Sequence, residues 1–371
     1  MKIICSRNSL LKSLNISMRA VPSHTTMDIL ECILIDASSN ILKFITNDMD
    51  LGIETIVEGH IEEKGIAAID AKIFYEIIRK LPDNDVRIVV DENFNTTITC
   101  EKARFQISAR SGEDFSYLPI VDRDRCITIS QFTLKELIRQ TIFSISAGDS
   151  NPLMTGELFE IRSNILRVVS LDGHRISMRI IHLEKDYENE KVIIPGKSLV
   201  EMSKILSGEI DETVTLYFSD NHVLFELENT MVVSRLIEGE YFRIDQMISN
   251  EYDTKITVNK KDFMDCIDRS SLLVRESEKK PLIMRVSDDQ MDLLMDSSMG
   301  RMNEEIDIVK EGKDILIGFN PRYFNDALRV INDEEITVFM VNPKAPCFIK
   351  DEKGSYFYLI LPVNINQNQY A

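Results

Sequence analysis

The chain has no tryptophan, and its 371 residues include few histidines and cysteines, five and six respectively. The cysteines form no CxxC pair, and the histidines occur at neither HxxxH nor HExxH spacing, so no zinc or redox motif is present. A glycine-rich phosphate loop is also missing. We therefore expect no catalytic residues, no metal and no cofactor.

Long apolar runs are absent as well. None approaches the roughly 20 residues that a membrane-spanning helix needs. The N-terminal segment "MKIICSRNSLL" lacks the apolar stretch and small-residue cleavage site of a signal peptide. Scattered cysteines in such a chain predict buried thiols in a reducing compartment. The expected location is the cytoplasm, with no membrane partner.

Two sequence blocks recur three times at a period near 125 residues. The first reads "KIICSRNSLLKSL", "CITISQFTLKELI" and "KITVNKKDFMDCI"; the second reads "GIAAIDAKIFYEIIRKL", "KVIIPGKSLVEMSKIL" and "DILIGFNPRYFNDALRVI". Each is typical of a short strand, a polar break and an amphipathic helix. Two patterns with one period indicate a triplicated domain. The equivalent apolar positions are Leu10, Leu134 and Phe263 in the first block, and Phe74, Leu199 and Phe324 in the second.

An excess of positive charge is also lacking, since 43 Lys and Arg face 61 Asp and Glu, for a net charge of −18. The six predicted helices nevertheless sum to +7, which leaves −25 for the rest of the chain. Glu suits helices as well as Lys does, so its scarcity there is informative. We interpret these helices as jointly facing a polyanion, although a simple preference of Lys and Arg for helices would give the same pattern.

Short β-type runs bounded by Asn, Asp, Gly and Pro fill the sequence between the blocks. The fold class is therefore α+β, with three tandem copies of a domain in which two helices pack on an antiparallel sheet of roughly eight strands. The predicted domains are residues 1–121, 122–250 and 251–371.

Three further segments carry a family resemblance: "FEIRSNILRVVSLDGHRISM", with "LDGHRIS" shortly after "TGELFE", and the C-terminal "SYFYLILPV". Together with the triplication, they resemble the β subunit of bacterial DNA polymerase III, the sliding-clamp family, over the full length. The resemblance implies a head-to-tail homodimer whose six domains form a ring. Such a ring encircles duplex DNA without reading its sequence and gives processivity to the polymerase. The implied partners are the DNA polymerase III α subunit, the clamp loader and other proteins with a clamp-binding motif.

The resemblance also implies a pocket for partner peptides at the junction of the second and third domains. The Asp172-Gly173 pair between alternating runs independently predicts a tight hairpin, with His174 and Arg175 beside an exposed turn. Apolar side chains there would hold a peptide's anchors, and Arg175 would fix its main chain. From the residues alone, a plain hairpin with core strands is the favoured explanation, and the family resemblance reverses that preference. The matching residues are Met154, Leu171, Gly173, His174, Arg175, Ile176, Phe242, Gln246, Met247, Leu359, Leu361, Pro362 and Val363.

The pocket departs from the family pattern at three positions. Phe242 replaces a proline, Gln246 stands where some members have arginine, and Leu171 stands where threonine is frequent. We expect the pocket to persist with a changed outline and peptide preference.

The resemblance implies two further surfaces. For the ring contact, Phe105 and Ile107 lie on one face of an edge strand, and Leu272 and Leu273 are their predicted partners, with core packing as the alternative. His24 stands where the family often has arginine, so a weaker DNA contact is expected there. The predicted DNA-facing residues are Arg7, Lys12, Arg19, His24, Lys72, Arg79, Lys80, Lys135, Arg139, Lys197, Lys204, Lys260, Lys261, Arg269, Arg322 and Arg329.

Two other hypotheses compete with the clamp. One is an enzyme that uses Asp172, His174 and a nearby carboxylate for acid–base chemistry. The other is an acidic repeat scaffold that binds proteins but no DNA.

Overall fold

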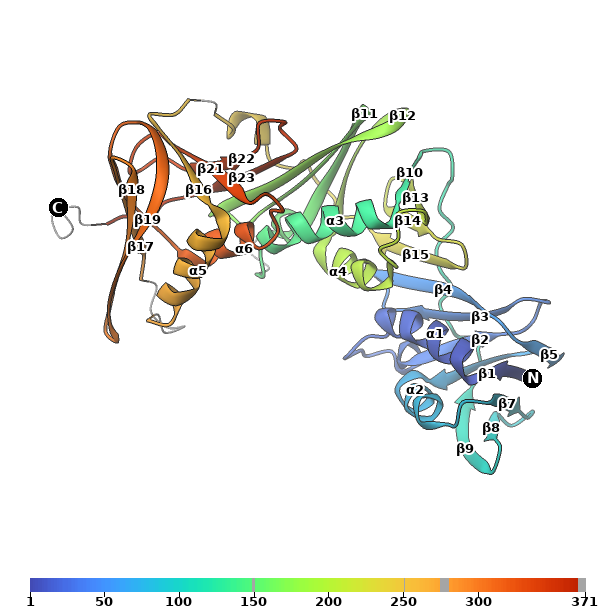
Figure 1. Ribbon diagram of the computed structural model, residues 1–371. Coiled ribbons are helices and arrows are strands. Elements are labelled where there is room, and N and C mark those ends of the chain that lie inside the picture. Colours follow the sequence, from blue (N-terminus) through green and yellow to red (C-terminus); the bar gives the residue numbers. More distant parts are fainter. Residues whose placement is uncertain (149–150, 250, 274–279, 366–371) are drawn as a thin grey trace. The chain divides into compact units, whose positions relative to one another are not determined.

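The computed structural model describes residues 1–148, 151–249, 251–273 and 280–365 (Figure 1). Its α-helices are α1 (Arg7–Ser17), α2 (Ala71–Lys80), α3 (Gln131–Thr141), α4 (Gly196–Ile205), α5 (Lys260–Ser271) and α6 (Pro321–Leu328). The strands of the first repeat are β1 (Lys2–Ser6), β2 (Cys32–Asp36), β3 (Leu42–Asn47), β4 (Leu51–Val57), β5 (His60–Glu63), β6 (Ile66–Asp70), β7 (Asp85–Val90), β8 (Asn95–Cys100) and β9 (Ala103–Arg110).

The middle repeat contains β10 (Cys126–Ser130), β11 (Gly156–Leu171), β12 (Arg175–Pro195), β13 (Thr213–Phe218), β14 (His222–Glu226) and β15 (Thr230–Arg235). The third contains β16 (Thr254–Asn259), β17 (Leu282–Ser287), β18 (Gln290–Ser297), β19 (Gly300–Gly312), β20 (Ile315–Phe319), β21 (Glu335–Met340), β22 (Cys347–Lys350) and β23 (Tyr356–Ile360). The prediction of roughly eight strands per repeat agrees with the third repeat, which has eight, and with the first, which has nine. Within the described ranges the middle repeat has six named strands, because two of them are very long. There, β11 and β12 are single strands of 16 and 21 residues.

All six predicted strand–break–helix blocks are present, as the pairs β1–α1, β6–α2, β10–α3, β12–α4, β16–α5 and β20–α6. The polar break acts as a helix N-cap. The Ser6 hydroxyl accepts from the Ser9 amide at 3.1 Å, and the Asp70 carboxylate accepts from the Ile73 amide at 2.8 Å.

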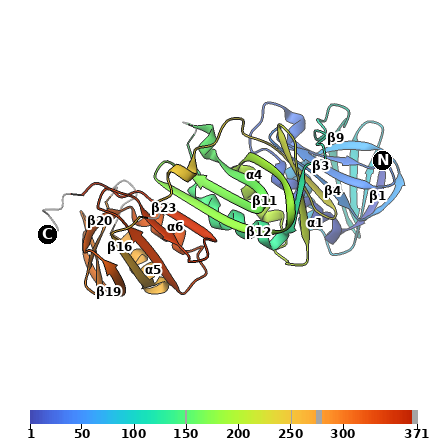
Figure 2. The ribbon, with the colours of Figure 1, turned by 90° about the horizontal axis from the view of Figure 1, so that it is seen from above.

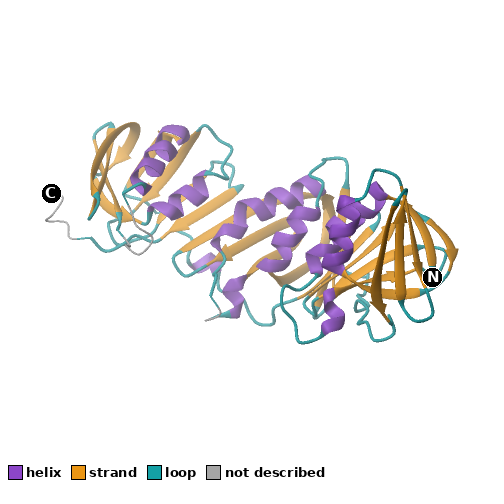
Figure 3. Cartoon of the chain, turned by 90° about the horizontal axis from the view of Figure 1, so that it is seen from below, coloured by secondary structure: helices purple, strands orange, loops and turns teal. Residues whose placement is uncertain are grey.

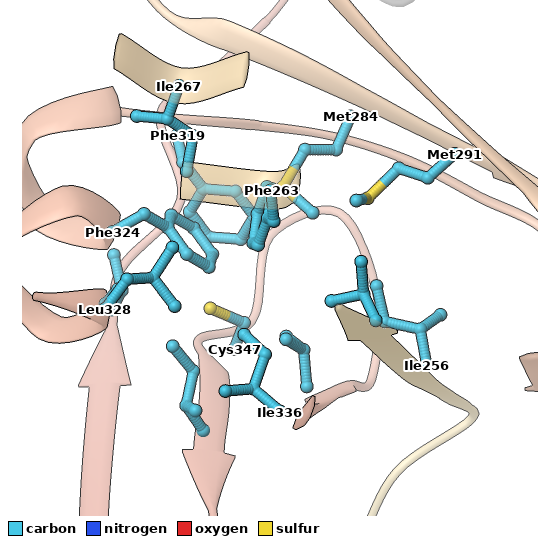
Figure 4. Packing of buried hydrophobic residues seen from close by; sticks show 14 of the residues in the cluster. Ile256, Phe263, Ile267, Met284, Met291, Phe319, Phe324, Leu328, Ile336 and Cys347 are labelled. Carbon is cyan, nitrogen blue, oxygen red and sulfur yellow. The ribbon is translucent and has the colours of Figure 1, made fainter. Parts of the chain in front are cut away.

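The equivalent apolar positions of the repeat are all core residues. Figure 3 shows the helices lying against strands, and the core positions of each helix are the ones expected on the face that packs against a sheet. In the third repeat, the Phe324 ring packs edge-on to the rings of Phe263 and Phe319 at centroid distances of 5.5 and 5.0 Å (Figure 4). Leu10, Leu134, Phe263, Phe74, Leu199 and Phe324 are all fully buried.

Contacts among the described residues divide the chain into two compact units rather than three. The first contains Met1–Leu134 and Lys197–Leu236, and the second contains Lys135–Gly196 with the chain from Ile237 onward. Each unit has one continuous antiparallel sheet. In the first unit β15 pairs with β4, and in the second β12 pairs with β23, as Figures 1 and 2 show. The middle repeat thus contributes strands to both sheets.

All six cysteines are free thiols, and five are buried as predicted, whereas Cys126 is half-buried. Burial raises the pKa of the Cys5 thiol to about 12, which keeps it protonated and unreactive. No helix in the described ranges is long and apolar enough to cross a membrane.

Candidate functional site

A cavity of about 400 Å³ opens beside the hairpin that joins β11 to β12 in the second unit. We call this cavity the groove. The hairpin, β23, the segment around Phe242 and the loop before β22 supply its walls, which are almost entirely apolar. Such a surface suits the apolar side chains of another molecule. It is lined by Met154, Leu171, Gly173, His174, Arg175, Ile176, Phe242, Met247, Pro346, Leu359 and Leu361.

The tight hairpin predicted at Asp172-Gly173 is present. The Asp172 carboxylate accepts hydrogen bonds from the amides of His174 at 3.0 Å and Arg175 at 3.2 Å. Gly173 has a φ of +85°, a conformation that other residues adopt at a cost. The His174 carbonyl accepts from the Leu361 amide at 2.8 Å, so the turn is also tied to the chain beyond β23.

Arg175 differs from its predicted role. Its guanidinium donates to Asp172 at 3.0 Å, to Asp326 of α6 at 2.6 Å and to the carbonyl of Phe143. It also lies over the rings of Tyr323, at 4.7 Å, and Phe143, at 5.4 Å. A side chain held in this way stabilises the groove's floor, so a free guanidinium for a peptide's main chain is not what the structure offers.

His174 is held by the same helix. Its ring stacks on Tyr323 with a centroid distance of 6.0 Å and an interplanar angle of 18°. The Asp172 carboxylate is meanwhile occupied by two amides and Arg175. These contacts hold both side chains in place beside the groove.

The segment that forms one wall of the groove lies over β11. Tyr241 is buried, and its hydroxyl donates to the carbonyl of Val169 at 3.3 Å. The Phe242 ring packs edge-on against Tyr241 at 5.6 Å. A 3₁₀-helix, η5 (Ile244–Gln246), follows, and Met247 comes next at the rim, 42% exposed. We call residues 242–247 the wall segment.

Ten of the thirteen predicted pocket residues line the groove, and three do not. Gln246 is exposed on η5, and Pro362 lies beyond the lining. The Val363 amide donates to the carbonyl of Gly318 at 2.8 Å, which directs the chain toward β20 instead. Pro346 was missed, because a proline between β21 and β22 reads as an ordinary turn residue. The binding role of all these residues stays a prediction.

The predicted DNA-facing residues lie on or near the six helices, and most are exposed. Arg7, Lys135, Arg139 and Lys260 are half-buried. Many of the set make ion pairs, most of them with acids on the same six helices, which the sum of +7 already includes. The pairs are Arg19 and Lys204 with Glu201, Arg79 with Glu76, Arg139 with Glu136, Lys197 with Asp48, Arg269 with Glu304, Arg322 with Asp326 and Arg329 with Asp268.

Four lysines and one histidine of the predicted DNA-facing set make no ion pair with another described residue. Within the ranges that the structure describes, Lys12, Lys72, Lys80, Lys261 and His24 are exposed and have no ion-pair partner. These side chains are available to a ligand without breaking an existing contact.

The predicted ring-contact residues divide into two kinds. Phe105 is 39% exposed and Leu272 is 73% exposed, so both present apolar surface. Ile107 and Leu273 are partly buried against the cores of the first and third repeats. Phe105 and Leu272 therefore fit the predicted interface, whereas Ile107 and Leu273 fit the alternative of core packing.

Comparison with known proteins gives a consistent result. Three family models match in order: the N-terminal domain of the DNA polymerase III beta subunit over residues 1–119, its central domain over 128–242 and its C-terminal domain over 245–364. The beta sliding clamp of Staphylococcus aureus is 35% identical over 98% of this chain and 99% of its own length.

Solved structures agree. A DNA polymerase III beta subunit from Eubacterium rectale superposes with a TM-score of 0.97 at 63% identity, and the match covers 98% of this chain and 100% of that one. A DNA polymerase sliding clamp from Bacillus subtilis gives a TM-score of 0.95 at 32% identity, covering 99% and 100%.

Proposed function

Because the chain belongs to the family of bacterial DNA polymerase III beta subunits, the beta sliding clamps, we propose that the groove is the site where it holds its protein partners. Its function is that of a DNA sliding clamp for the polymerase in replication, as the resemblance in the sequence predicted. The groove would then bind a short peptide of the DNA polymerase III α subunit, and of the clamp loader and other clamp-binding proteins in turn.

The apolar lining of the groove carries this proposal. Each Leu- or Phe-sized anchor that a peptide buries contributes about 1.5–3 kcal/mol, so two or three anchors give useful affinity. The floor is fixed in advance by Arg175 and His174, which lowers the ordering cost of binding. Phe242, Met154 and Met247 give the walls an aromatic and two flexible thioethers, a combination that adapts to differently shaped anchors.

A peptide-binding experiment tests the groove. The probe is a synthetic peptide with the C-terminal residues of the same organism's α subunit, and its affinity is measured by calorimetry. Replacing His174→Ala together with Leu361→Ala should weaken binding at least tenfold, because both remove lining surface. Val363→Ala is the matched control, since this residue bonds toward β20. Equal affinities for all three proteins would place the binding site elsewhere.

We also infer that two chains close the ring head to tail through two strand edges. Within the described ranges, residues 103–108 of β9 pair only with β8, and residues 300–307 of β19 pair only with β18. Each of these strands therefore has one unpaired edge. Pairing of these edges between protomers would extend a sheet, as in β-strand addition. Exposed Phe105 and Leu272 would be covered, and Arg104 of β9 would approach Glu305 of β19. A heterologous contact of this kind closes when its rotation allows.

Ring function has a direct test. After action of the clamp loader, the protein should remain on nicked circular duplex DNA and slide off the same DNA once it is linearised, because topology rather than affinity retains it. Equal loss from both forms would contradict an encircling ring.

The remaining assignments are consistent with this function. We take the domains as residues 1–121, 122–250 and 251–371, close to the three family matches. We infer a cytoplasmic, non-catalytic processivity subunit. The occupied Asp172 carboxylate and the stacked His174 ring argue against acid–base chemistry at the hairpin.

A further inference from the structure

We propose that Arg167, which does not line the groove, positions the groove's wall through its ion pair with Asp245. The proposal concerns regulation of the groove's shape and rests on the proposed function, since a bound peptide is what the wall would contact. Arg167 lies on the second half of β11, and Asp245 lies within η5.

A chain of four alternating charges connects the two elements. The Arg167 guanidinium donates to Asp245 at 2.5 Å and contacts the carboxylate of Glu160 at 2.5 Å. Glu160 also accepts from Arg162 at 2.7 Å. Of the two inner side chains, Glu160 is buried at 7% exposure and Arg167 is half-buried at 16%, whereas the outer two are 63% and 64% exposed. Shielding from water strengthens the inner contact between Arg167 and Glu160, which holds the guanidinium in place, while the contact with Asp245 is more exposed.

The contact between Glu160 and Arg167 shows how β11 runs. Seven residues of straight strand span about 23 Å, too far for these side chains to meet. The strand therefore bends back near Ser163, which has a φ of +56° and lies where the pairing with β12 is irregular. The bend brings Arg167 to a fixed place on the sheet, from which it can hold η5.

The wall segment has two kinds of attachment. Ile244 is buried, and buried Tyr241 precedes the segment, but apolar contacts are non-directional. Asp245 provides the directional contact, and the hydrogen bond from Arg167 holds the pKa of this carboxyl below its usual value, so it stays ionised at neutral pH. Phe242 comes three residues before Asp245 and Met247 two residues after it, and both line the groove.

Backbone hydrogen bonds within the segment transmit the position of Asp245. The Gln246 amide donates to the carbonyl of Arg243 at 3.1 Å, and the Met247 amide donates to that of Ile244 at 2.9 Å. If Asp245 is released, this short turn can rotate, and Met247 moves with it. The width of the groove is then set by a residue outside it.

Asp245→Asn is the informative change, because it releases η5 while Arg167 keeps its contact with Glu160 and no buried charge loses all its partners. Arg167→Met would disturb both carboxylates and confuse the result. Glu240→Gln is the matched control: it removes the same charge from an exposed position just before the segment. Asp245→Glu keeps the carboxylate and should restore the contact in part.

Two measurements are made on the full-length protein and these variants. The first is the affinity of the α-subunit peptide; the second is hydrogen exchange at the amides of Gln246 and Met247. We expect Asp245→Asn to bind about threefold to tenfold more weakly and to exchange faster at both amides, with an unchanged midpoint of thermal unfolding. Glu240→Gln should match the parent protein, and Asp245→Glu should recover most of the affinity.

The outcomes separate this proposal from the function on which it rests. If the parent protein does not bind the peptide, the proposed function fails, and exchange alone decides whether Arg167 holds the wall. If the parent binds and Asp245→Asn binds equally well, the positioning role is overturned. Unchanged exchange at Gln246 and Met247 overturns it as well.

Discussion

The guanidinium of Arg175 donates to the carboxylate of Asp326 at 2.6 Å, and this bond joins β12 of the middle repeat to α6 of the third. Asp326 also lies 3.9 Å from Arg322, a predicted DNA-facing residue that is 80% exposed. One carboxylate therefore contacts both the arginine below the groove and an arginine on the helix surface. The contact with Arg175 is shorter and better shielded from water, so it should contribute more to stability than the contact with Arg322.

Removal of the Asp326 charge should destabilise the second unit. Hydrogen bonds to charged groups contribute about 1.5–3 kcal/mol when one partner is shielded. We expect Asp326→Asn to lower the free energy of unfolding in urea by that amount, whereas Arg322→Ala should change it by less than about 0.5 kcal/mol. Equal costs for the two variants would mean that the contact with Arg175 has no special weight.

A second buried carboxylate has no such partner. Glu157 of β11 is fully buried, and neither of its oxygens has a hydrogen bond within the described part of the chain. Burial raises the pKa of this carboxyl to about 8, and nearby Thr141, whose hydroxyl donates to the Leu137 carbonyl, opposes the shift only in part. The side chain is therefore mostly neutral at pH 7.

Stability should consequently fall as pH rises. Between the ordinary pKa of 4.5 and the folded value near 8, the native state binds one more proton than the unfolded state. The free energy of unfolding then decreases by roughly 1.4 kcal/mol per pH unit in this window and levels off above it. Glu157→Gln removes this contribution, so its advantage over the parent should grow from pH 5 to pH 8. Urea titrations at several pH values measure the free energy of unfolding of the parent, of Glu157→Gln and of the exposed control Glu188→Gln. If this free energy depends on pH in the same way for all three proteins, the prediction is wrong.

The sequence predicted the repeated elements because their signals are local. A capping residue such as Ser6 or Asp70 and an apolar stripe around Leu10 or Phe74 lie within a dozen residues of each other. The strand pairs that join one repeat to the next could not be predicted in this way. Pairing of β15 with β4 joins residues about 180 positions apart, and no local pattern specifies it.

The groove shows the same limit. Its hairpin follows from Asp172-Gly173, and most of its lining follows from the family resemblance. The hydrogen bond from the Arg175 guanidinium to Asp326 could not be predicted, because the two residues are 151 positions apart in the sequence. Nor does the alternation in "TGELFE" reveal that Glu157 faces inward without a partner.

The ring contact gives a prediction that separates assembly from folding. Leu272 is 73% exposed, whereas adjacent Leu273 packs against the core of the third repeat. Leu272→Asp should give monomers in sedimentation equilibrium with an unchanged free energy of unfolding. Leu273→Asp should lower that free energy by about 1–3 kcal/mol, because it buries a charge without a partner. A stable dimer of Leu272→Asp would show that the interface lies elsewhere.

The predicted DNA-facing surface gives a pair of variants with opposite expected effects. Glu201 of α4 contacts Lys204 at 2.6 Å and Arg19 at 3.7 Å. One carboxylate thus pairs with two residues that are predicted to face DNA. Glu201→Gln frees both cations, while Lys72→Ala removes one that has no ion-pair partner among the described residues. Each phosphate contact changes the slope of log affinity against log salt concentration by about 0.9.

Titration of a short duplex at several salt concentrations should therefore show tighter binding with a steeper slope for Glu201→Gln, and weaker binding with a shallower slope for Lys72→Ala. Tighter contact should also slow diffusion of the loaded ring along DNA, because more phosphate contacts must be broken at each step. This would explain why a chain that encircles DNA neutralises so many of its own cations: retention comes from topology, and weak contact leaves the ring free to slide. If both variants shift the slope in the same direction, the two helices do not face DNA.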